Sequence, residues 1–170
     1  MKIIVTSQRL FLREFEISDA IHFYNLNSDP EVIKYTGDPS FNSIEEAETF
    51  IQNYSAYRDY GYGRWAVCLK ENANFIGFCG LKFHPKERIT EVGYRFFKDQ
   101  WNKGYATESV LSCLDYGFSK LKLQEIYAHA HIKNKASHRV IEKCGLHFVK
   151  EFQYDNMPAK LYCLKNTSIL

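Results

Sequence analysis

EVGYRFFKDQWNKGYATE, residues 91–108, is the stretch of sequence that decides the fold. Its first half alternates bulky and small side chains, which predicts a strand, and the polar segment around Gly104 predicts a turn into a helix. The first N–H groups of a helix have no partner within the helix, and the helix dipole adds partial positive charge beside them. We therefore expect the loop formed by residues 101–107 to bind a phosphate group, although a helix that simply begins after a turn has the same pattern.

The remaining sequence alternates between patterns typical of strands and of helices. Strands are expected at residues 9–15, 64–70, 74–83, 90–97, 125–132, 146–154 and 160–165, and helices at 18–25, from Pro30, at 43–54, 104–118 and 135–144. The alternation in residues 9–15 predicts a half-exposed strand, and Ser43 with Glu46 fits a capping box that begins a helix of roughly four turns. This order predicts an α+β (mixed α/β) fold, in which helices flank a central mixed, mostly antiparallel sheet of about six to seven strands.

Length and composition indicate one globular domain over residues 1–170, with 45% hydrophobic and 25% charged residues. The five cysteines are widely spaced and form no C-x-x-C pair, which indicates a reducing compartment and disfavours both a disulfide framework and a metal site. Ile3, Ile4 and Val5 form too short an apolar run for a signal peptide or a membrane span. We therefore expect a cytoplasmic protein.

The charges of the chain are unevenly distributed. Residues 14–59 contain ten acidic and two basic residues, a net charge of −8, whereas residues 119–150 contain seven basic and two acidic residues, a net charge of +5. This division fits a cationic substrate on one side and an anionic ligand on the other. Solvated helix faces that merely differ in sign explain it equally well.

A second polar motif, NKASHRVIEKCG, occupies residues 134–145 and begins a helix that follows a strand. Asn134 is placed to cap this helix at its start, and Gly145 to end it. Five segments that occur in order along the chain are RLFLREFEISDA (9–20), IGFCGL (76–81), EVGYRF (91–96), WNKGYATE (101–108) and NKASHRVIEKCGL (134–146). In this order and spacing the chain resembles the GNAT superfamily of acyl-CoA N-acyltransferases, and within it the RimJ/RimL-type branch, over residues 7–165.

The resemblance implies a GNAT-type fold and acetyl-CoA as the acyl donor, with no metal. The main chain of Phe96 and Phe97 would pair with the pantetheine arm, and the N–H of Phe96 would polarise the thioester carbonyl. Asn134 would bond the pantetheine, and Arg139 or Lys143 would contact the adenosine phosphates. The main-chain amides that would hold the pyrophosphate belong to Trp101, Asn102, Lys103, Gly104, Tyr105, Ala106 and Thr107.

Two positions depart from the superfamily pattern. Trp101 stands where Gln or Arg is frequent, and Ile141 stands where many members have a tyrosine that protonates the leaving thiolate. Ser137 is our candidate acid for that step, and helix capping is its alternative role.

Attack on a thioester needs an amine without its extra proton, so a base is expected near the acyl group. Glu91 is our candidate for this base, through a water if the distance is long. It lies near the start of the strand that delivers Phe96, at a position where related enzymes often have a glutamate. A surface glutamate paired with Arg88 or Lys82 is the alternative. Tyr94 and His84 are further candidates. His129 and His131 have no ligand partners at metal-site spacing, so both are interpreted as structural.

These observations predict an acetyl-CoA-dependent N-acetyltransferase that moves the acetyl group to a primary amine by direct attack. A protein N-terminus, a polyamine or an aminoglycoside-like compound is the expected acceptor, attracted by the acidic residues 14–59. The alternative is a catalytically impaired CoA-binding sensor or assembly module. Nucleic-acid and membrane partners are not expected, because the net charge is only +2 and no stacking motif separates the lysines of the basic segment. The protein is expected to be a monomer or a homodimer.

Overall fold

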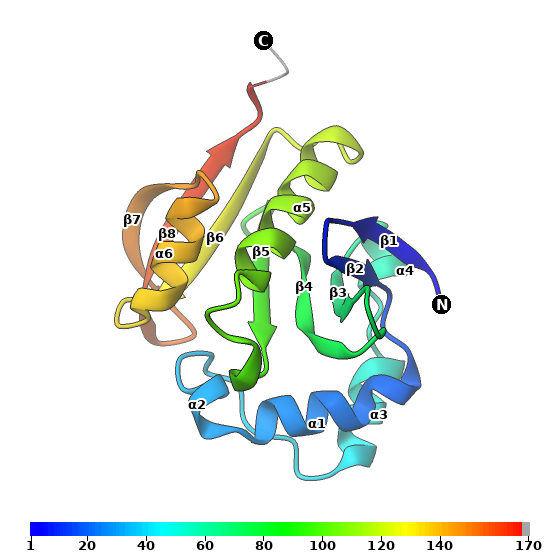
Figure 1. Cartoon of the computed structure of the whole chain (residues 1–170). Coiled ribbons are helices and arrows are strands. Elements are labelled where there is room, and N and C mark those ends of the chain that lie inside the picture. Colours follow the sequence, from blue (N-terminus) through cyan, green and yellow to red (C-terminus); the bar gives the residue numbers. More distant parts are fainter. Residues whose placement is uncertain (168–170) are drawn as a thin grey trace.

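The computed structural model describes residues 1–167 as one eight-stranded sheet with helices on both faces (Figure 1). The strands are β1 (Ile3–Thr6), β2 (Leu10–Arg13), β3 (Arg64–Leu69), β4 (Phe75–His84), β5 (Ile89–Phe96), β6 (Glu125–His131), β7 (His147–Tyr154) and β8 (Met157–Lys165). The helices are α1 (Ala20–Ser28), α2 (Pro30–Ile33), α3 (Ile44–Gln52), α4 (Ala56–Tyr60), α5 (Tyr105–Ser119) and α6 (Lys135–Lys143). None of the helices in this part of the chain is long and apolar enough to cross a membrane.

The strands lie in the order β1-β2-β3-β4-β5-β6-β8-β7. Every neighbouring pair is antiparallel except β5 and β6, which are parallel. The predicted α+β fold with a mixed, mostly antiparallel sheet is therefore confirmed. The strand that the sequence did not reveal is β1, a four-residue edge strand that pairs with β2.

Each face of the sheet has its own hydrophobic core. On one face, α5 and α6 cover a cluster that includes Trp65, Leu81 and Val110. On the other face, α1 and α3 pack Phe23 and Ile51 against the sheet. Figure 1 shows α5 and α6 in front of the sheet and α1 below it.

Strand β2 belongs to both cores, so the predicted half-exposed strand is wrong: all four of its residues are buried. Leu10 and Leu12 face the α5 side, and Phe11 faces α1 and α3. The strand is buried because β1 and β3 flank it and helices cover both of its faces. Arg13 is buried as well, and its guanidinium donates to both carboxylate oxygens of Asp19, at 2.7 and 2.6 Å.

Helix α3 begins where the sequence predicts but is shorter. The Ser43 hydroxyl accepts a hydrogen bond from the Glu46 N–H, which confirms the N-cap. The Glu46 carboxylate bonds to the main chain of Asn42 rather than of Ser43, so the second half of the capping box is displaced by one residue. The helix ends at Gln52, after nine residues or about two and a half turns. Tyr54 is thereby left outside the helix, and its hydroxyl accepts from the Arg64 N–H at 2.6 Å.

Loss of one partner of the buried pair of Arg13 and Asp19 should destabilise the fold strongly. Asp19→Asn keeps the shape but leaves the Arg13 charge buried without its counter-ion, so we expect the free energy of unfolding to fall by about 3 kcal/mol. Glu16→Gln is the control, because Glu16 is half exposed and lies 3.9 Å from Arg13, so its loss should cost less than about 1 kcal/mol. Urea titration of both variants measures the difference, and equal losses would contradict the assignment.

Candidate functional site

The sheet opens between β5 and β6. These two parallel strands are paired at one position, Glu91 with Tyr127, although both continue beyond it. A cavity of about 950 Å³ lies there and is lined by residues 92–95 of β5 and 128–131 of β6. The sheet therefore has a gap in its middle, which is accessible to a ligand.

The main chain of β5 faces this gap with unused polar groups. The Phe97 N–H donates to the Ile76 carbonyl at 3.2 Å. Since hydrogen-bonded and non-bonded pairs alternate along an antiparallel ladder, Val92, Tyr94 and Phe96 direct their main-chain groups away from β4 and towards the gap. This placement favours Phe96 for a main-chain contact with a ligand. It disfavours Phe97, whose N–H and carbonyl both have partners, the carbonyl accepting from the Gln100 N–H at 2.9 Å, whereas the Phe96 N–H has none in β4.

On the helix side of the gap, α6 presents Asn134 and Ser137 to the cavity. The Asn134 side-chain oxygen accepts from the Ser137 N–H at 3.1 Å, which confirms the predicted N-cap and leaves the amide NH₂ group of Asn134 free to donate. The Tyr94 hydroxyl is buried nearby and has no hydrogen-bond partner within residues 1–167. Burial raises the pKa of this phenol, and the neighbouring Ser137 opposes part of that rise.

The 101–107 loop provides a row of free amides at the start of α5. Gly104 has a φ of +83°, in the left-handed region that favours glycine, and the first main-chain bond of the helix runs from the Glu108 N–H to the Gly104 carbonyl. The main-chain N–H groups from Asn102 to Thr107 have no partner in the described part of the chain. The Trp101 N–H is different, because it donates to the Lys98 carbonyl at 3.2 Å. Residues 102–107 thus present free amides at the start of a helix, and their binding of a phosphate stays a prediction.

Arg9 binds the loop and the first turn of α5, a contact that the sequence did not predict. Its side chain donates to the Lys103 carbonyl at 3.0 Å and to Glu108 at 2.7 Å, and its guanidinium lies 4.5 Å from the centre of the Tyr105 ring. Burial alone would raise the pKa of Glu108, but bonds from the Arg9 N–H, the Ser7 hydroxyl and the Arg9 side chain hold it below its ordinary value. Nothing in the local pattern marks this contact, because Arg9 and Glu108 are 99 positions apart.

On the opposite face of the sheet, Glu91 is the centre of a buried polar cluster. Its Oε1 atom accepts from Arg64 at 2.7 Å, and its Oε2 atom lies 2.8 Å from Nε2 of His84 and 3.0 Å from Nδ1 of His129. The alternative expectation, a surface glutamate paired with Arg88 or Lys82, is therefore wrong.

Glu91 stays ionised in this environment. Burial alone would raise the pKa of its carboxyl group, but Arg64 and the two histidines outweigh burial and hold the pKa well below the ordinary value. The group therefore loses its charge only when the pH falls through that lowered value. Arg64 has room beside the strand because residue 93 is a glycine. A Cβ atom at this position would lie only 2.5 Å from the guanidinium.

His129 is part of this cluster, a contact that its interpretation as a structural residue did not include. Its ring packs on Tyr154 with 3.9 Å between the ring centres, and it lines the cavity. His131, two residues along the same strand, stacks on Tyr35 instead. No group of His, Cys, Asp and Glu suited to a metal ion occurs within residues 1–167. In the Glu91 cluster, both imidazoles approach the same carboxylate oxygen, Oε2.

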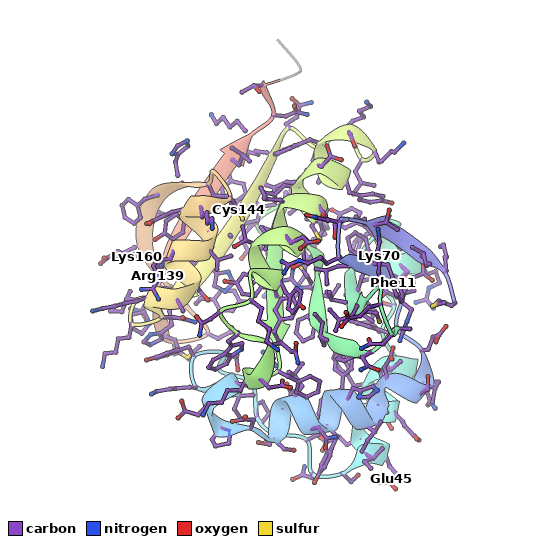
Figure 2. The ribbon with its side chains drawn as sticks, in the orientation of Figure 1. Phe11, Glu45, Lys70, Arg139, Cys144 and Lys160 are labelled. Carbon is purple, nitrogen blue, oxygen red and sulfur yellow. The ribbon has the colours of Figure 1, made fainter. Side chains whose placement is uncertain are left out.

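The acidic segment contributes to the same cavity. Asp38, Glu46 and Asp59 line it together with several aromatic side chains. Asp38 is paired with Arg95 at 2.5 Å. Arg139 and Lys143 lie elsewhere, on the exposed side of α6, where Figure 2 labels Arg139. They are four residues apart and thus share a helix face.

Comparisons with known proteins agree with this geometry. Residues 9–147 match the family model described as the acetyltransferase (GNAT) domain. The uncharacterised N-acetyltransferase YoaA of Bacillus subtilis (strain 168) is 32% identical over 160 residues, which cover 90% of this chain and 89% of YoaA. The chain belongs to the GNAT acetyltransferase family.

Two further GNAT proteins are similar over most of the chain. A crystal structure of a GNAT-family acetyltransferase from Bacillus anthracis has a TM-score of 0.82 at 27% identity and covers 95% of this chain and 98% of that one. The spermidine N(1)-acetyltransferase of Vibrio cholerae serotype O1 is 28% identical over 153 residues, which cover 86% of each chain. The chain is thus an N-acetyltransferase with acetyl-CoA as its donor.

The two departures from the GNAT pattern have a structural description. The Trp101 indole N–H donates to the Phe96 carbonyl at 3.0 Å, so this side chain ties the loop to the end of β5. Ile141 is buried and lines the cavity, so an apolar side chain occupies the position of the frequent tyrosine. The Tyr94 phenol, whose hydroxyl has no hydrogen-bond partner within residues 1–167, lines the same cavity from β5.

The geometry of the loop predicts a specific effect on cofactor binding. Gly104→Ala places a Cβ atom at a positive φ and 3.3 Å from Arg9, so the amides should be displaced. We expect CoA affinity to fall about tenfold, the loss of one charge-assisted hydrogen bond. Gly145→Ala is the matched control, because its φ is +89° and a Cβ atom there meets nothing within 4 Å. Isothermal titration calorimetry should show weaker CoA binding for Gly104→Ala alone, and equal affinities would argue against the loop.

Proposed function

We propose that this enzyme holds acetyl-CoA in the gap between β5 and β6 and transfers its acetyl group directly to a primary amine. The observation that supports this most is the single paired position between the two strands, with free loop amides on one side and the Glu91 cluster on the other. In the proposal, residues 102–107 bind the pyrophosphate, and Asn134 donates to the pantetheine. Either Arg139 or Lys143 is proposed to contact the adenosine phosphates, and both residues remain candidates.

The Phe96 N–H is the proposed donor to the thioester carbonyl. It points into the gap from the middle of the sheet, and the Trp101 indole bonds the carbonyl of the same residue, which ties this end of β5 to the 101–107 loop. A donor that is already oriented stabilises the oxyanion of the tetrahedral intermediate without reorganisation.

Ser137 remains the proposed acid for the leaving thiolate, with the Tyr94 hydroxyl beside it. Both line the cavity on the α6 side, where the sulfur must lie if the arm enters between α5 and α6. The raised pKa of Tyr94 keeps this phenol protonated, so it can donate.

The acceptor is proposed to approach from the opposite face, where Glu91 supplies negative charge near the attacking amine. Acids from residues 14–59 and aromatic side chains line that side, which fits a cation with an apolar body. A protein N-terminus, a polyamine or an aminoglycoside-like compound meets this description, and the RimJ/RimL-type motifs and the spermidine-acetylating relative support this range. One domain over residues 1–170, a cytoplasmic location, and a monomer or homodimer remain parts of the prediction.

Steady-state kinetics with acetyl-CoA and a panel of amines test the proposal. The panel contains peptides with a free N-terminus, spermidine and an aminoglycoside, and release of free thiol reports transfer. We expect transfer to at least one of them, and Glu91→Gln to lower kcat roughly 100-fold, the usual share of acid–base catalysis, without changing CoA affinity. Unchanged kinetics in Glu91→Gln would remove Glu91 from the reaction.

A CoA-binding sensor or assembly module is the second candidate, favoured by the apolar Ile141 in place of the tyrosine. This function predicts a rise of the melting temperature with CoA but no acetyl transfer to any amine of the panel. Acetyl transfer by the unaltered enzyme, together with slower transfer in the Tyr94→Phe or Ser137→Ala variant, would exclude a function as a sensor or assembly module.

A further inference from the structure

Two histidines approach one oxygen of Glu91. Nε2 of His84 lies 2.8 Å and Nδ1 of His129 lies 3.0 Å from Oε2. An ionised carboxylate oxygen only accepts hydrogen bonds, so each nitrogen that faces it must carry its hydrogen. A neutral His129 is therefore held as the Nδ1–H tautomer, with the lone pair on Nε2, and a neutral His84 as the Nε2–H tautomer.

The two rings differ in what their other nitrogen can reach. His129 lines the cavity from β6, on the side of the gap that faces β5, whereas His84 is not part of the cavity wall. No residue within 1–167 bonds to Nε2 of His129. Tyr154 packs on the ring and restricts its rotation, so the free nitrogen keeps one direction.

Glu91 itself is poorly placed to take a proton. Arg64 occupies Oε1, and the two histidines occupy Oε2. Protonation of the carboxyl group would break a buried pair with Arg64 and leave that charge uncompensated.

We propose that Nε2 of His129 accepts the proton of the acceptor ammonium, and that Glu91 is a positioning residue that orients the imidazole and stabilises its charged form. This inference rests on the proposed transferase function. The N–H bond of the ammonium breaks and its proton passes to Nε2. The freed lone pair then attacks the thioester carbon, and the C–S bond breaks as the amide forms. The second proton of the amine neutralises the thiolate on the α6 side, so one proton leaves through His129.

The charges around His129 set the expected pH dependence. Glu91 on β5, Arg64 on β3 and His84 on β4 share its cluster, Tyr154 contacts it from β7, and Asp38 and Asp155 line the same cavity. Burial raises the pKa of Tyr154 to about 12, so this phenol is neutral in the working range. Since Glu91 stays ionised there too, the fall of kcat/KM on the acid side should come from protonation of His129.

The test compares pH profiles of three variants. His129→Gln should lower kcat/KM roughly 100-fold and abolish the acid limb of the profile, while CoA affinity is unchanged. Glu91→Gln should keep that limb but shift it to lower pH, because removal of the neighbouring negative charge makes the imidazolium easier to deprotonate. His147→Gln is the control, since His147 is exposed on β7 and outside the cavity. A limb that survives in His129→Gln and disappears in Glu91→Gln would overturn the inference.

A second readout does not depend on transfer. ¹⁵N NMR of the histidine side chains above their titration should show His129 with hydrogen on Nδ1 and His84 with hydrogen on Nε2. The inference fails if His129 carries its hydrogen on Nε2. An enzyme with these tautomers but no transfer to any amine would instead count against the proposed function.

Discussion

The parallel contact between β5 and β6 is the constraint on which the rest of the site depends. Main-chain N–H and C=O groups in a folded protein need partners, yet the β6-facing groups of β5 beyond Glu91 have no strand beside them. Such an edge suits an extended ligand, because strand-like pairing supplies affinity without dependence on side chains.

Two ion pairs, one largely buried and one partly exposed, hold the elements that surround the gap. Arg64 of β3 crosses β4 and reaches Glu91 on β5, and it also donates to the Gly80 carbonyl at 2.5 Å. Arg9, just before β2, ties the 101–107 loop to Glu108 of α5. Each guanidinium donates hydrogen bonds to several acceptors at once. The loop proposed to bind acetyl-CoA and the Glu91 cluster proposed to face the amine are therefore fixed by separate multidentate contacts.

The sequence was sufficient for features whose causes are local. The caps at Ser43 and Asn134, the turn at Gly104 and most strands follow from neighbouring residues, and the structure confirms them. Long-range contacts were not accessible in this way. The burial of β2, the Arg9 contacts and the true partners of Glu91 depend on which strands become neighbours. The contact of His129 with Glu91 could not be predicted for the same reason: the alternation of β6 places His129 on a strand face, but only the strand order brings that face to Glu91.

The most direct measurement is a crystal structure of the chain with acetyl-CoA bound. We expect the pantetheine arm between β5 and β6, bonded to the main chain of Tyr94 and Phe96. The phosphates should lie on residues 102–107, and the acetyl carbon between Ser137 and His129. A cofactor bound elsewhere, with the gap closed by direct pairing of β5 and β6, would contradict it.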